Sequence, residues 1–416
     1  MKITFIQPNV GYKGHTWEAL GIGYIISTLR KYIKEDLDIN FYSGFYDSDK
    51  TILRGAEDSD IIGFGCTSPQ FKHALDLSKK LRSENNWIVM GGIHPTCLPK
   101  DVIREKDVDI VIEGEGELSF YRIVRNILEN RQSRNTIVNS RSIKNLDNLP
   151  YPDRDTIKNE RNIQQAYNDG GKRITSIFSS RGCPFNCSFC CSRFLWGSKA
   201  RIRSPINVLD EFEYTVNKWN IDFIKFADDT FTLNRGKVKE FCNEKIKRNI
   251  NIPFGANAHV NTINRDLLEH LYKANCTELW YGVESGSPRI LKDMNKHTNV
   301  DKIRDAFKLT KEYGIKTRAY FLLGMPNETI EDIKMTEELC DELEPDMVGF
   351  ALLSPFPNNE YYDHDLMKDW DWSTFDEYNN NWVNTKTLSN EDLRYEQKRL
   401  IDKYRRYVVF RHKDKV

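Results

Sequence analysis

Apolar residues occur in short runs along the first 130 positions, and stretches with amphipathic helical spacing separate these runs. A short apolar run bounded by turn residues predicts a buried strand, and apolar positions three or four apart predict a helix. Such an alternation is typical of a parallel, doubly wound α/β sheet, which we assign to residues 1–132. Strands are expected at 2–8, 38–44, 60–67, 87–93 and 108–113, and helices at 17–34, 70–84 and 117–130.

The same alternation returns in residues 173–356. Six strand–helix units predict a partial barrel, and the sites of such barrels lie at the carboxyl ends of the strands. The expected strands are 174–179, 222–228, 253–260, 277–284, 316–324 and 347–354.

Two segments fall outside these domains. Residues 133–172 are polar and then contain two closely spaced prolines, which predicts a linker with an extended path. Residues 357–416 form a C-terminal region rich in aromatic residues. Its last helix is expected to begin at Ser389, with Asp392 as the reciprocal capping partner.

Charge and hydropathy exclude several classes of function. The 416 residues include 61 Lys and Arg against 61 Asp and Glu, a formal net charge of zero, whereas nucleic-acid binding needs a basic face. Mean hydropathy is −0.61, and no apolar run approaches the roughly 20 residues of a membrane span. Residues 1–8 have the pattern of a strand and not of a signal peptide. Nine cysteines without such a signal predict a reducing cytoplasm.

Three cysteines, Cys183, Cys187 and Cys190, follow the first strand of the second domain. Thiolates this close can converge on one metal centre, and soft sulfur ligands select iron–sulfur clusters, zinc or copper(I). A structural zinc site needs four protein ligands, and no second Cys or His pair stands nearby. Cys191 is a poor fourth ligand, because consecutive residues of an extended chain point to opposite sides. A thioredoxin-like interpretation leaves Cys183 unused.

A closed [4Fe–4S] cluster takes four cysteine ligands, so three ligands leave one iron open. This spacing, with Phe189 before the last cysteine, resembles the radical S-adenosylmethionine (SAM) superfamily. The resemblance implies that the three cysteines hold the cluster and that the amino and carboxylate groups of SAM chelate the open iron. It also implies SAM contacts from residues near the strand ends, namely Phe189, Arg203, Asp229, Asn257, Asn261, Glu284, Gly324 and Glu328.

Three of these positions also have an ordinary structural explanation. Glu284 is compatible with a solvated loop carboxylate. Glu328 is compatible with an acid near the positive end of a helix that begins at that point. Arg203 either binds a carboxylate through two hydrogen bonds or pairs with a surface acid.

The first domain carries a second resemblance. The stretches 91–96 (Gly-Gly-Ile-His-Pro-Thr) and 113–117 (Glu-Gly-Glu-Gly-Glu) stand at the carboxyl ends of two predicted strands, where ligands of such sheets bind. Together with residues 146–154, they resemble the cobalamin-binding-domain radical SAM family, which is class B methylase-like. The resemblance implies corrin contacts from Thr67, Ser68, Gly91, Gly92, His94, Thr96, Glu113, Gly114 and Gly116.

His94 is a candidate for the lower ligand of cobalt, since histidine is a common metal ligand. The better-known cobalamin domains use an Asp-x-His-x-x-Gly motif, which this chain lacks. In the fusion family the lower face of cobalt is often left without a protein imidazole. His94 is therefore expected to form a local hydrogen bond or to pack against the corrin, with direct ligation as the alternative.

The resemblance implies a cobalamin-dependent radical SAM enzyme, with a Rossmann-like (flavodoxin-like) domain before a partial (β/α)6 barrel. The expected reaction is methylation of an unactivated carbon through a 5′-deoxyadenosyl radical and methylcobalamin, with flavodoxin or ferredoxin as electron donor. Three alternatives stay open: ring closure, oxidation or coupling without methyl transfer; a corrinoid- or tetrapyrrole-binding protein with a structural or sensory cluster; and a radical SAM enzyme with a degenerate first domain. The substrate could be a small molecule, a lipid, a tetrapyrrole or a peptide.

Overall fold

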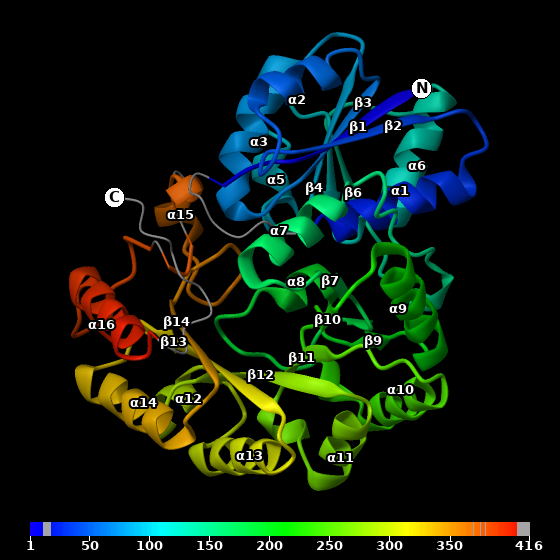
Figure 1. Ribbon diagram of the computed structural model, residues 1–416. Coiled ribbons are helices and arrows are strands. Elements are labelled where there is room, and N and C mark those ends of the chain that lie inside the picture. Colours follow the sequence, from blue (N-terminus) through cyan, green and yellow to red (C-terminus); the bar gives the residue numbers. More distant parts are fainter. Residues whose placement is uncertain (11–17, 369, 375, 379, 406–416) are drawn as a thin grey trace.

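Two parallel sheets of six strands each organise the chain (Figure 1). The computed structural model describes residues 1–10, 18–368, 370–374, 376–378 and 380–405. The first sheet has the strand order β2-β1-β3-β4-β5-β6, so its order reverses between β1 and β3, as in flavodoxin-like folds. Its strands are β1 (Lys2–Gln7), β2 (Asp38–Ser43), β3 (Ile61–Gly65), β4 (Trp87–Gly91), β5 (Ile110–Glu113) and β6 (Thr136–Asn139).

Helices cover both faces of the first sheet. Side chains of α1 (Leu20–Tyr32) and α6 (Gly116–Leu128) share one buried apolar cluster with the strands, and those of α2 (Asp49–Ala56) and α3 (Ser68–Leu81) share another. Burial of both faces explains why these strands have nearly continuous apolar sequences. Two short helices, α4 (Ile93–Cys97) and α5 (Pro99–Val102), follow β4.

Residues 133–172, predicted to be a linker, contain a strand and a helix. β6 pairs with β5 at the edge of the first sheet, and α7 (Glu160–Gly170) precedes the second domain. The first sheet therefore extends past the predicted boundary at residue 132. Four residues between polar neighbours are too short a run for a periodic pattern to indicate a strand.

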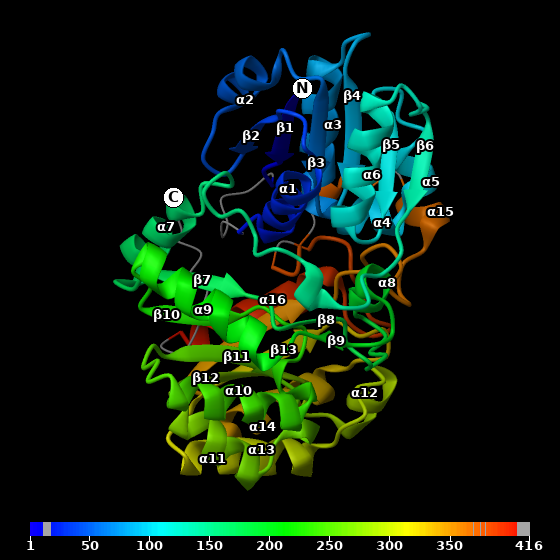
Figure 2. The ribbon, with the colours of Figure 1, turned by 90° about the vertical axis from the view of Figure 1, so that its right-hand side faces the viewer.

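The second sheet has the order β7-β10-β11-β12-β13-β14. Among the described strands, β7 and β14 each pair with one neighbour of this sheet, so the barrel is partial, as predicted. Helices α9 to α14 surround it (Figure 2). The strands are β7 (Ile174–Ile177), β10 (Phe223–Phe226), β11 (Phe254–Ala258), β12 (Cys276–Glu284), β13 (Lys316–Leu323) and β14 (Met347–Leu352). The helices are α9 (Pro205–Trp219), α10 (Arg235–Lys247), α11 (Arg265–Lys273), α12 (Pro288–Asp293), α13 (Val300–Glu312) and α14 (Ile330–Leu343).

A small hairpin follows β7. Its strands β8 (Ser180–Arg181) and β9 (Arg201–Ile202) are antiparallel, and the segment between them contains helix α8 (Ser192–Trp196). The hairpin therefore holds the two ends of the cysteine segment together.

The C-terminal region contains α15 (His364–Met367) and α16 (Asn390–Lys403). Ser389 and Asp392 form the predicted capping box at the start of α16. Before this helix, the region contacts the first domain through exposed groups: His364 pairs with Asp101 at 2.9 Å, and Lys72 pairs with Asp371 at 2.6 Å. Of the aromatic residues in this region, Phe375, Tyr407 and Phe410 lie outside the described residues.

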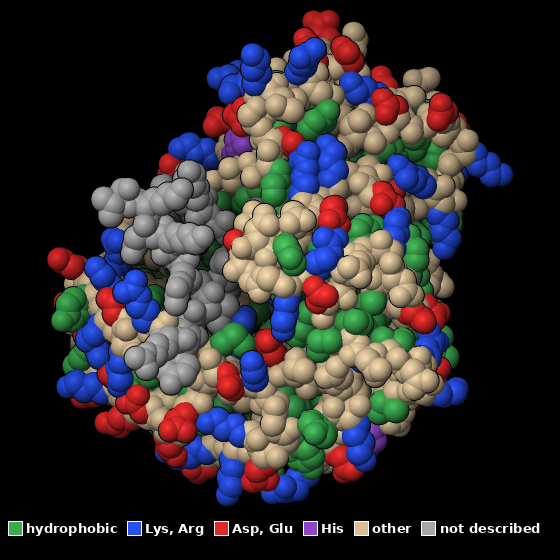
Figure 3. Space-filling view, viewed as in Figure 1, with side chains coloured by type: hydrophobic (Ala, Val, Ile, Leu, Met, Phe, Trp, Pro, Cys, Tyr) green, Lys and Arg blue, Asp and Glu red, His purple; other side chains and the backbone are tan. Residues whose placement is uncertain are grey.

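The first domain is stacked on the barrel (Figures 1 and 2). On the face shown in Figure 3, basic and acidic side chains are mixed, and no large area of one sign is visible among the coloured residues. None of the helices in the described residues is both long enough and apolar enough to cross a membrane.

Candidate functional site

The cysteine segment begins at the carboxyl end of β7. Gly182 turns the chain into it with φ +92°, and a Cβ atom there would lie 3.0 Å from the carbonyl oxygen of Lys199. Cys183, Cys187 and Cys190 are half-exposed and free. Burial raises the pKa of the Cys187 thiol to about 11, and the other two thiols act on it in the same direction. The three thiols are therefore close neighbours in one loop.

The three thiols suit a cluster better than a single ion. In the described part of the chain, no three His, Cys, Asp or Glu side chains are placed to hold one metal ion. A cubane cluster binds each thiolate through a different iron, so its ligands lie farther apart than those of a single ion. Three soft donors fit a [4Fe–4S] cluster with one open iron, and they do not fit a four-ligand zinc site.

The neighbouring Cys191 has a different contact. Its thiol donates to the carbonyl oxygen of Pro357 at 3.6 Å, in the C-terminal region. Five other cysteines are buried, as expected for small apolar side chains: Cys66, Cys97, Cys242, Cys276 and Cys340.

Packing from three elements holds the cysteine segment in place. Phe185 stacks on His259 with ring centroids 4.1 Å apart. The Ser188 amide donates to the carbonyl oxygen of Met294, and the Ser188 hydroxyl lies 2.6 Å from that of Tyr361. These supports could not be predicted from the sequence, because each joins residues more than 70 positions apart.

Asp228 anchors the start of this segment. It is buried, and its carboxylate accepts hydrogen bonds from the Ser179 amide (3.1 Å), the Ser179 hydroxyl (2.8 Å) and the Ser180 hydroxyl. Burial raises the pKa of Asp228 to about 6. The next residue, Asp229, is exposed at the strand end and acts on the pKa of Cys190. Burial raises the pKa of Asp229, and hydrogen bonds with Ser192 and the Gly182 backbone oppose this shift without cancelling it.

A buried ion pair lies next to the cysteines. Glu284, at the end of β12, has φ +69°, and its carboxylate is 2.6 Å from the ammonium of Lys296. Lys296 also lies 5.7 Å from the ring centroid of Phe189. Burial lowers the pKa of Lys296, but Glu284 and then Cys187 outweigh this effect, so the net shift is upward. The arrangement places one buried cation and one buried anion beside the cluster ligands.

Glu284 was a candidate from the sequence, and Lys296 was not. Lys296 follows α12 in a loop without a recognisable motif. A buried ammonium of this kind can bind a carboxylate, and a buried carboxylate can bind an ammonium, which are the two charged groups of an amino acid. The pair is thus suited to the methionyl part of SAM.

The two predicted asparagines lie on the next strand, β11, and just after it. Asn257 donates from its side-chain amide to the carbonyl oxygen of Asp228 at 3.0 Å. Asn261 donates to the carbonyl oxygen of His297 at 2.7 Å and accepts from Thr298 at 3.0 Å. Asn261 therefore ties the loop after β11 to the loop that carries Lys296.

Arg203 is buried and has protein partners for its guanidinium. Its guanidinium donates to Glu211 at 2.5 Å and to the carbonyl oxygen of Phe178 at 2.7 Å, and the side chains of Arg203 and Glu211 are 5% and 1% exposed. Arg203 therefore pairs with an acid, as one of the two explanations expected, but this acid is buried and does not lie on the surface. We do not assign Arg203 to SAM.

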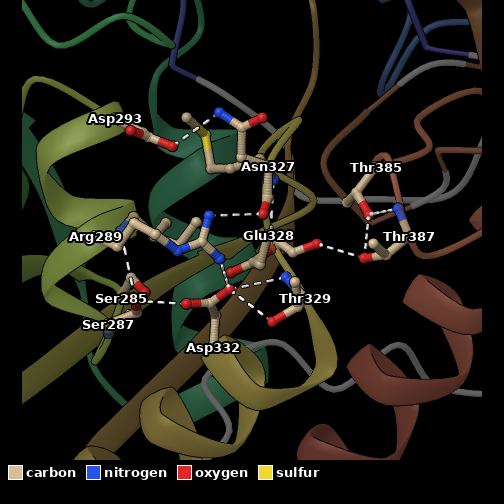
Figure 4. A network of polar contacts seen from close by, with 12 residues as sticks. Ser285, Ser287, Arg289, Asp293, Asn327, Glu328, Thr329, Asp332, Thr385 and Thr387 are labelled. Atoms are coloured by element: carbon tan, nitrogen blue, oxygen red, sulfur yellow. Dashed lines mark hydrogen bonds and ion pairs between the residues drawn. The ribbon is translucent and has the colours of Figure 1, made fainter.

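Glu328 lies beneath the turn that begins at Gly324. Its Oε2 atom accepts the amides of Gly324 (2.5 Å) and Met325 (3.3 Å), and Gly324 has φ +94°. Figure 4 shows Glu328 beside the capping box of Thr329 and Asp332. Glu328 thus shapes the turn through Oε2, whereas its buried Oε1 atom has no hydrogen-bond partner among the described residues.

The same network joins three loops. Asp332 accepts from Ser287 at 2.6 Å and pairs with Arg289, whose Nη1 donates to the carbonyl oxygen of Asn327 at 2.9 Å (Figure 4). Thr387, from the C-terminal region, donates to the carbonyl oxygen of Glu328 at 3.2 Å. The turn at Gly324 is therefore fixed relative to the end of β12.

We expect Glu328 to make stability depend on pH. Burial raises the pKa of its carboxyl to about 8 in the folded chain, from 4.5. A raised acid pKa stabilises the fold below the unfolded value, and this stabilisation is lost as pH rises through the folded value. The melting temperature of the wild type, relative to that of Glu328→Gln, should therefore fall between about pH 5 and about pH 9. Parallel curves would contradict this prediction, and Glu331→Gln, at an exposed neighbour, is the control.

The predicted corrin contacts come from three loops of the first sheet, which hydrogen bonds join. The loop after β3 carries Thr67, which caps α3, and Ser68. The Ser68 hydroxyl lies 3.0 Å from Nδ1 of His94 in the loop after β4. The Thr96 hydroxyl accepts the amide of Gly114 at 3.0 Å, and Gly114 follows β5. The three loops thus form one continuous rim.

Several positions of this rim are glycines, which carry no side chain. Gly92 has φ +102°, and a Cβ atom there would lie 2.6 Å from the carbonyl oxygen of Cys66. A Cβ atom on Gly116 would lie 2.7 Å from Ile25. At Gly91 the nearest atom would be Cβ of Ile112, at an ordinary 3.8 Å. The backbone at Gly91 is therefore open to the approach of a large flat ligand, whereas Gly92 is required by the fold. Glu113 is the half-buried last residue of β5.

His94 is buried and 2% exposed. It stacks on Phe71 with ring centroids 4.2 Å apart and contacts Trp372 of the C-terminal region at 6.2 Å. Burial lowers its pKa to about 3, so the imidazole is neutral. Local hydrogen bonding, the role expected for His94, is the one the structure contains.

Comparison with known proteins agrees with both domains. The family model of the Radical SAM superfamily matches residues 177–340, and that of the B12 binding domain matches residues 7–124. The anaerobic magnesium-protoporphyrin IX monomethyl ester cyclase of Rubrivivax gelatinosus is 30% identical over 391 residues, which is 87% of this chain and 69% of the cyclase. The chain belongs to the radical SAM superfamily and carries an N-terminal B12-binding domain.

This radical SAM enzyme also resembles methyltransferases. An uncharacterized methyltransferase of Pyrococcus horikoshii is 29% identical over 371 residues, which is 84% of this chain and 79% of the relative. The structure of the radical SAM methyltransferase TsrM from Kitasatospora setae, with cobalamin and a [4Fe-4S] cluster bound, superposes with a TM-score of 0.72. That match has 16% identity and covers 86% of this chain and 73% of TsrM, so it confirms the predicted fold.

Proposed function

We propose that this radical SAM enzyme is a cobalamin-dependent methyltransferase that methylates an unactivated carbon. One observation carries the proposal. Arg181, two residues before Cys183, forms a buried ion pair with Glu115, which lies between Gly114 and Gly116 in the rim of the first sheet. The candidate cluster loop and the candidate corrin loop are therefore joined directly.

The residues divide by the group that each would hold. Cys183, Cys187 and Cys190 would hold a [4Fe–4S] cluster, and Lys296 with Glu284 would orient the amino-acid end of SAM. The residues that would hold cobalamin are Thr67, Ser68, Gly91, Gly92, His94, Thr96, Glu113, Gly114 and Gly116. When bound, these groups supply hydrogen abstraction from carbon and a transferable methyl group, while the protein orients them and excludes water and oxygen.

A second candidate function is ring closure without methyl transfer. The cyclase of Rubrivivax gelatinosus, at 30% identity, favours it, because that relative matches 87% of this chain and the methyltransferase of Pyrococcus horikoshii matches 84%. The two functions differ in whether a methyl group is transferred to the substrate. Analysis of the products distinguishes them.

The reaction needs an electron donor, and a flavodoxin or ferredoxin suits a low-potential cluster. All nine cysteines are free, which supports a reducing compartment such as the cytoplasm. The substrate class stays open among small molecules, lipids, tetrapyrroles and peptides.

The test uses anaerobically purified protein reconstituted with iron, sulfide and cobalamin, given SAM and a strong reductant. We expect bound corrinoid in the visible spectrum, and both 5′-deoxyadenosine and S-adenosylhomocysteine as products. 5′-Deoxyadenosine alone, with corrinoid bound, would favour ring closure. A protein that assembles no cluster would overturn both functions.

Gly91→Ala tests the corrin site separately. The fold accepts this methyl group, since its nearest neighbour would lie at 3.8 Å. Overpacking against a ligand costs about 1–3 kcal/mol, so cobalamin affinity should fall roughly 10- to 100-fold. S-adenosylhomocysteine formation should fall with it at limiting cobalamin, and 5′-deoxyadenosine formation should stay. Gly21→Ala, on α1 with no atom within 4 Å of the new Cβ, is the matched control.

A further inference from the structure

The hairpin of β8 and β9, which closes the cysteine segment, forms ion pairs with the first domain. Arg181, at the end of β8, places Nη1 3.0 Å from Oε2 of Glu115 and Nη2 2.5 Å from Oε1 of Glu117. These three side chains are 6%, 2% and 4% exposed. Charges buried this deeply are stable only when they are paired and hydrogen-bonded.

The second strand of the hairpin also binds the carboxylate of Glu115. Arg201, in β9, places Nη1 2.6 Å from Oε1 of Glu115, and the same nitrogen donates to the carbonyl oxygen of Ile143 at 2.7 Å. The guanidinium of Arg181 also packs on two aromatic rings, with its central carbon 5.2 Å from the centroid of Tyr24 and 5.0 Å from that of Trp196. We call Arg181, Arg201, Glu115 and Glu117 the interdomain ion cluster.

On each side, the interdomain ion cluster is adjacent in sequence to a candidate site: the cysteine segment on one side and the rim on the other. On the barrel side, Arg181 is followed by Gly182, whose positive φ directs the chain to Cys183. On the other side, Glu115 alternates with Gly114 and Gly116 in the rim. The Glu-Gly-Glu-Gly-Glu stretch therefore has two surfaces, because its glycines belong to the rim while two of its acids bind the hairpin.

We propose that the interdomain ion cluster sets the distance and orientation between the cysteine segment and the corrin-binding rim. Its members are positioning residues, since each acts through the loop that it holds. A planar guanidinium that binds two carboxylates fixes direction as well as distance. This inference rests on the proposed function, because the placement matters only if a cluster and a corrin act on one substrate.

Glu115→Gln is the decisive variant, and the chain offers a matched control. Glu211 is also a buried carboxylate that binds two arginines, Arg203 at 2.5 Å and Arg154 at 3.2 Å, and its side chain is 1% exposed. These partners join Glu211 to the barrel and to residues 133–172, and not to the rim. Glu115→Gln and Glu211→Gln should therefore lower the melting temperature similarly.

Only Glu115→Gln should disturb the relation between the two cofactors. A misplacement of about 1 Å can cost roughly 100-fold in rate, so methyl transfer per 5′-deoxyadenosine should fall by up to about that factor. The magnetic interaction between cob(II)alamin and the reduced cluster, measured by pulsed electron paramagnetic resonance, should also change. Cluster content and cobalamin content should stay at wild-type levels.

Equal transfer ratios and equal magnetic interactions in the two variants would overturn the inference. The magnetic measurement decides the inference even if the wild type transfers no methyl group, so its failure is separable from that of the proposed function. Arg181→Lys provides a second variant if Glu115→Gln does not fold. Lysine keeps the positive charge but lacks the planar guanidinium that binds two carboxylates. We therefore expect a shift of the magnetic interaction smaller than that of Glu115→Gln. A wild-type value would count against the inference.

Discussion

Cys187→Ala is expected to abolish cluster assembly and to reduce SAM cleavage to background. The physical reason is the donor count: three thiols leave one iron open, and two thiols leave two irons without protein ligands. Iron and sulfide content after reconstitution, the visible absorbance of the cluster and 5′-deoxyadenosine formation measure the effect. Cys183→Ala and Cys190→Ala should behave in the same way.

Cys191→Ala is the matched control for this experiment. Cys191 is adjacent to Cys190 in sequence, but its thiol donates to the carbonyl oxygen of Pro357. This variant should assemble a full cluster and cleave SAM at a rate close to that of the wild type. Loss of the cluster in Cys191→Ala, together with retention in Cys187→Ala, would show that the ligand set is wrong.

Lys296→Met is expected to destabilise the protein by about 3–5 kcal/mol, because it leaves the buried carboxylate of Glu284 without its partner. The two side chains are 9% and 11% exposed in the pair, so water compensates little of the loss. Urea unfolding of the cofactor-free protein measures the free energy of unfolding. A loss below about 1 kcal/mol, the range of exposed pairs, would contradict the buried pair.

The double variant Lys296→Met/Glu284→Gln separates structure from function. It removes both charges, so much of the stability should return. The affinity of the double variant for SAM should nevertheless be roughly 10-fold or more below that of the wild type. Hydrogen bonds to charged groups contribute about 1.5–3 kcal/mol, and the double variant lacks both charges. Equilibrium binding of SAM to the reconstituted protein measures this effect. Restored affinity in the double variant would assign the pair to the fold alone.

Segments with buried apolar residues were predictable from the sequence, whereas β6, with no buried residue, and the two-residue hairpin strands were not. The strands of the barrel and the helices that surround it follow from apolar spacing, because each element buries one face or two. β6 and the hairpin strands β8 and β9 have four, two and two residues, so their pairing is set by the neighbouring structure and not by a pattern.

The residues of the candidate site also differ in how far the sequence could predict them. The cysteines and Glu284 were predictable because they stand in motifs at strand ends. Arg203 and Glu328 stand at similar places, but each found a partner within eight residues, Glu211 for the first and the Gly324 amide for the second. Lys296 and the interdomain ion cluster depend on contacts between distant segments, which one sequence does not reveal.

The two kinds of contact between the domains respond differently to ionic strength. The pairs of the C-terminal region, Lys72 with Asp371 and His364 with Asp101, have side chains that are 36–57% exposed, so dissolved salt screens them. The interdomain ion cluster is buried and largely shielded from salt. Dissolved salt should therefore weaken only the exposed pairs of the C-terminal region, while the interdomain ion cluster and the buried contact of His94 with Trp372 persist.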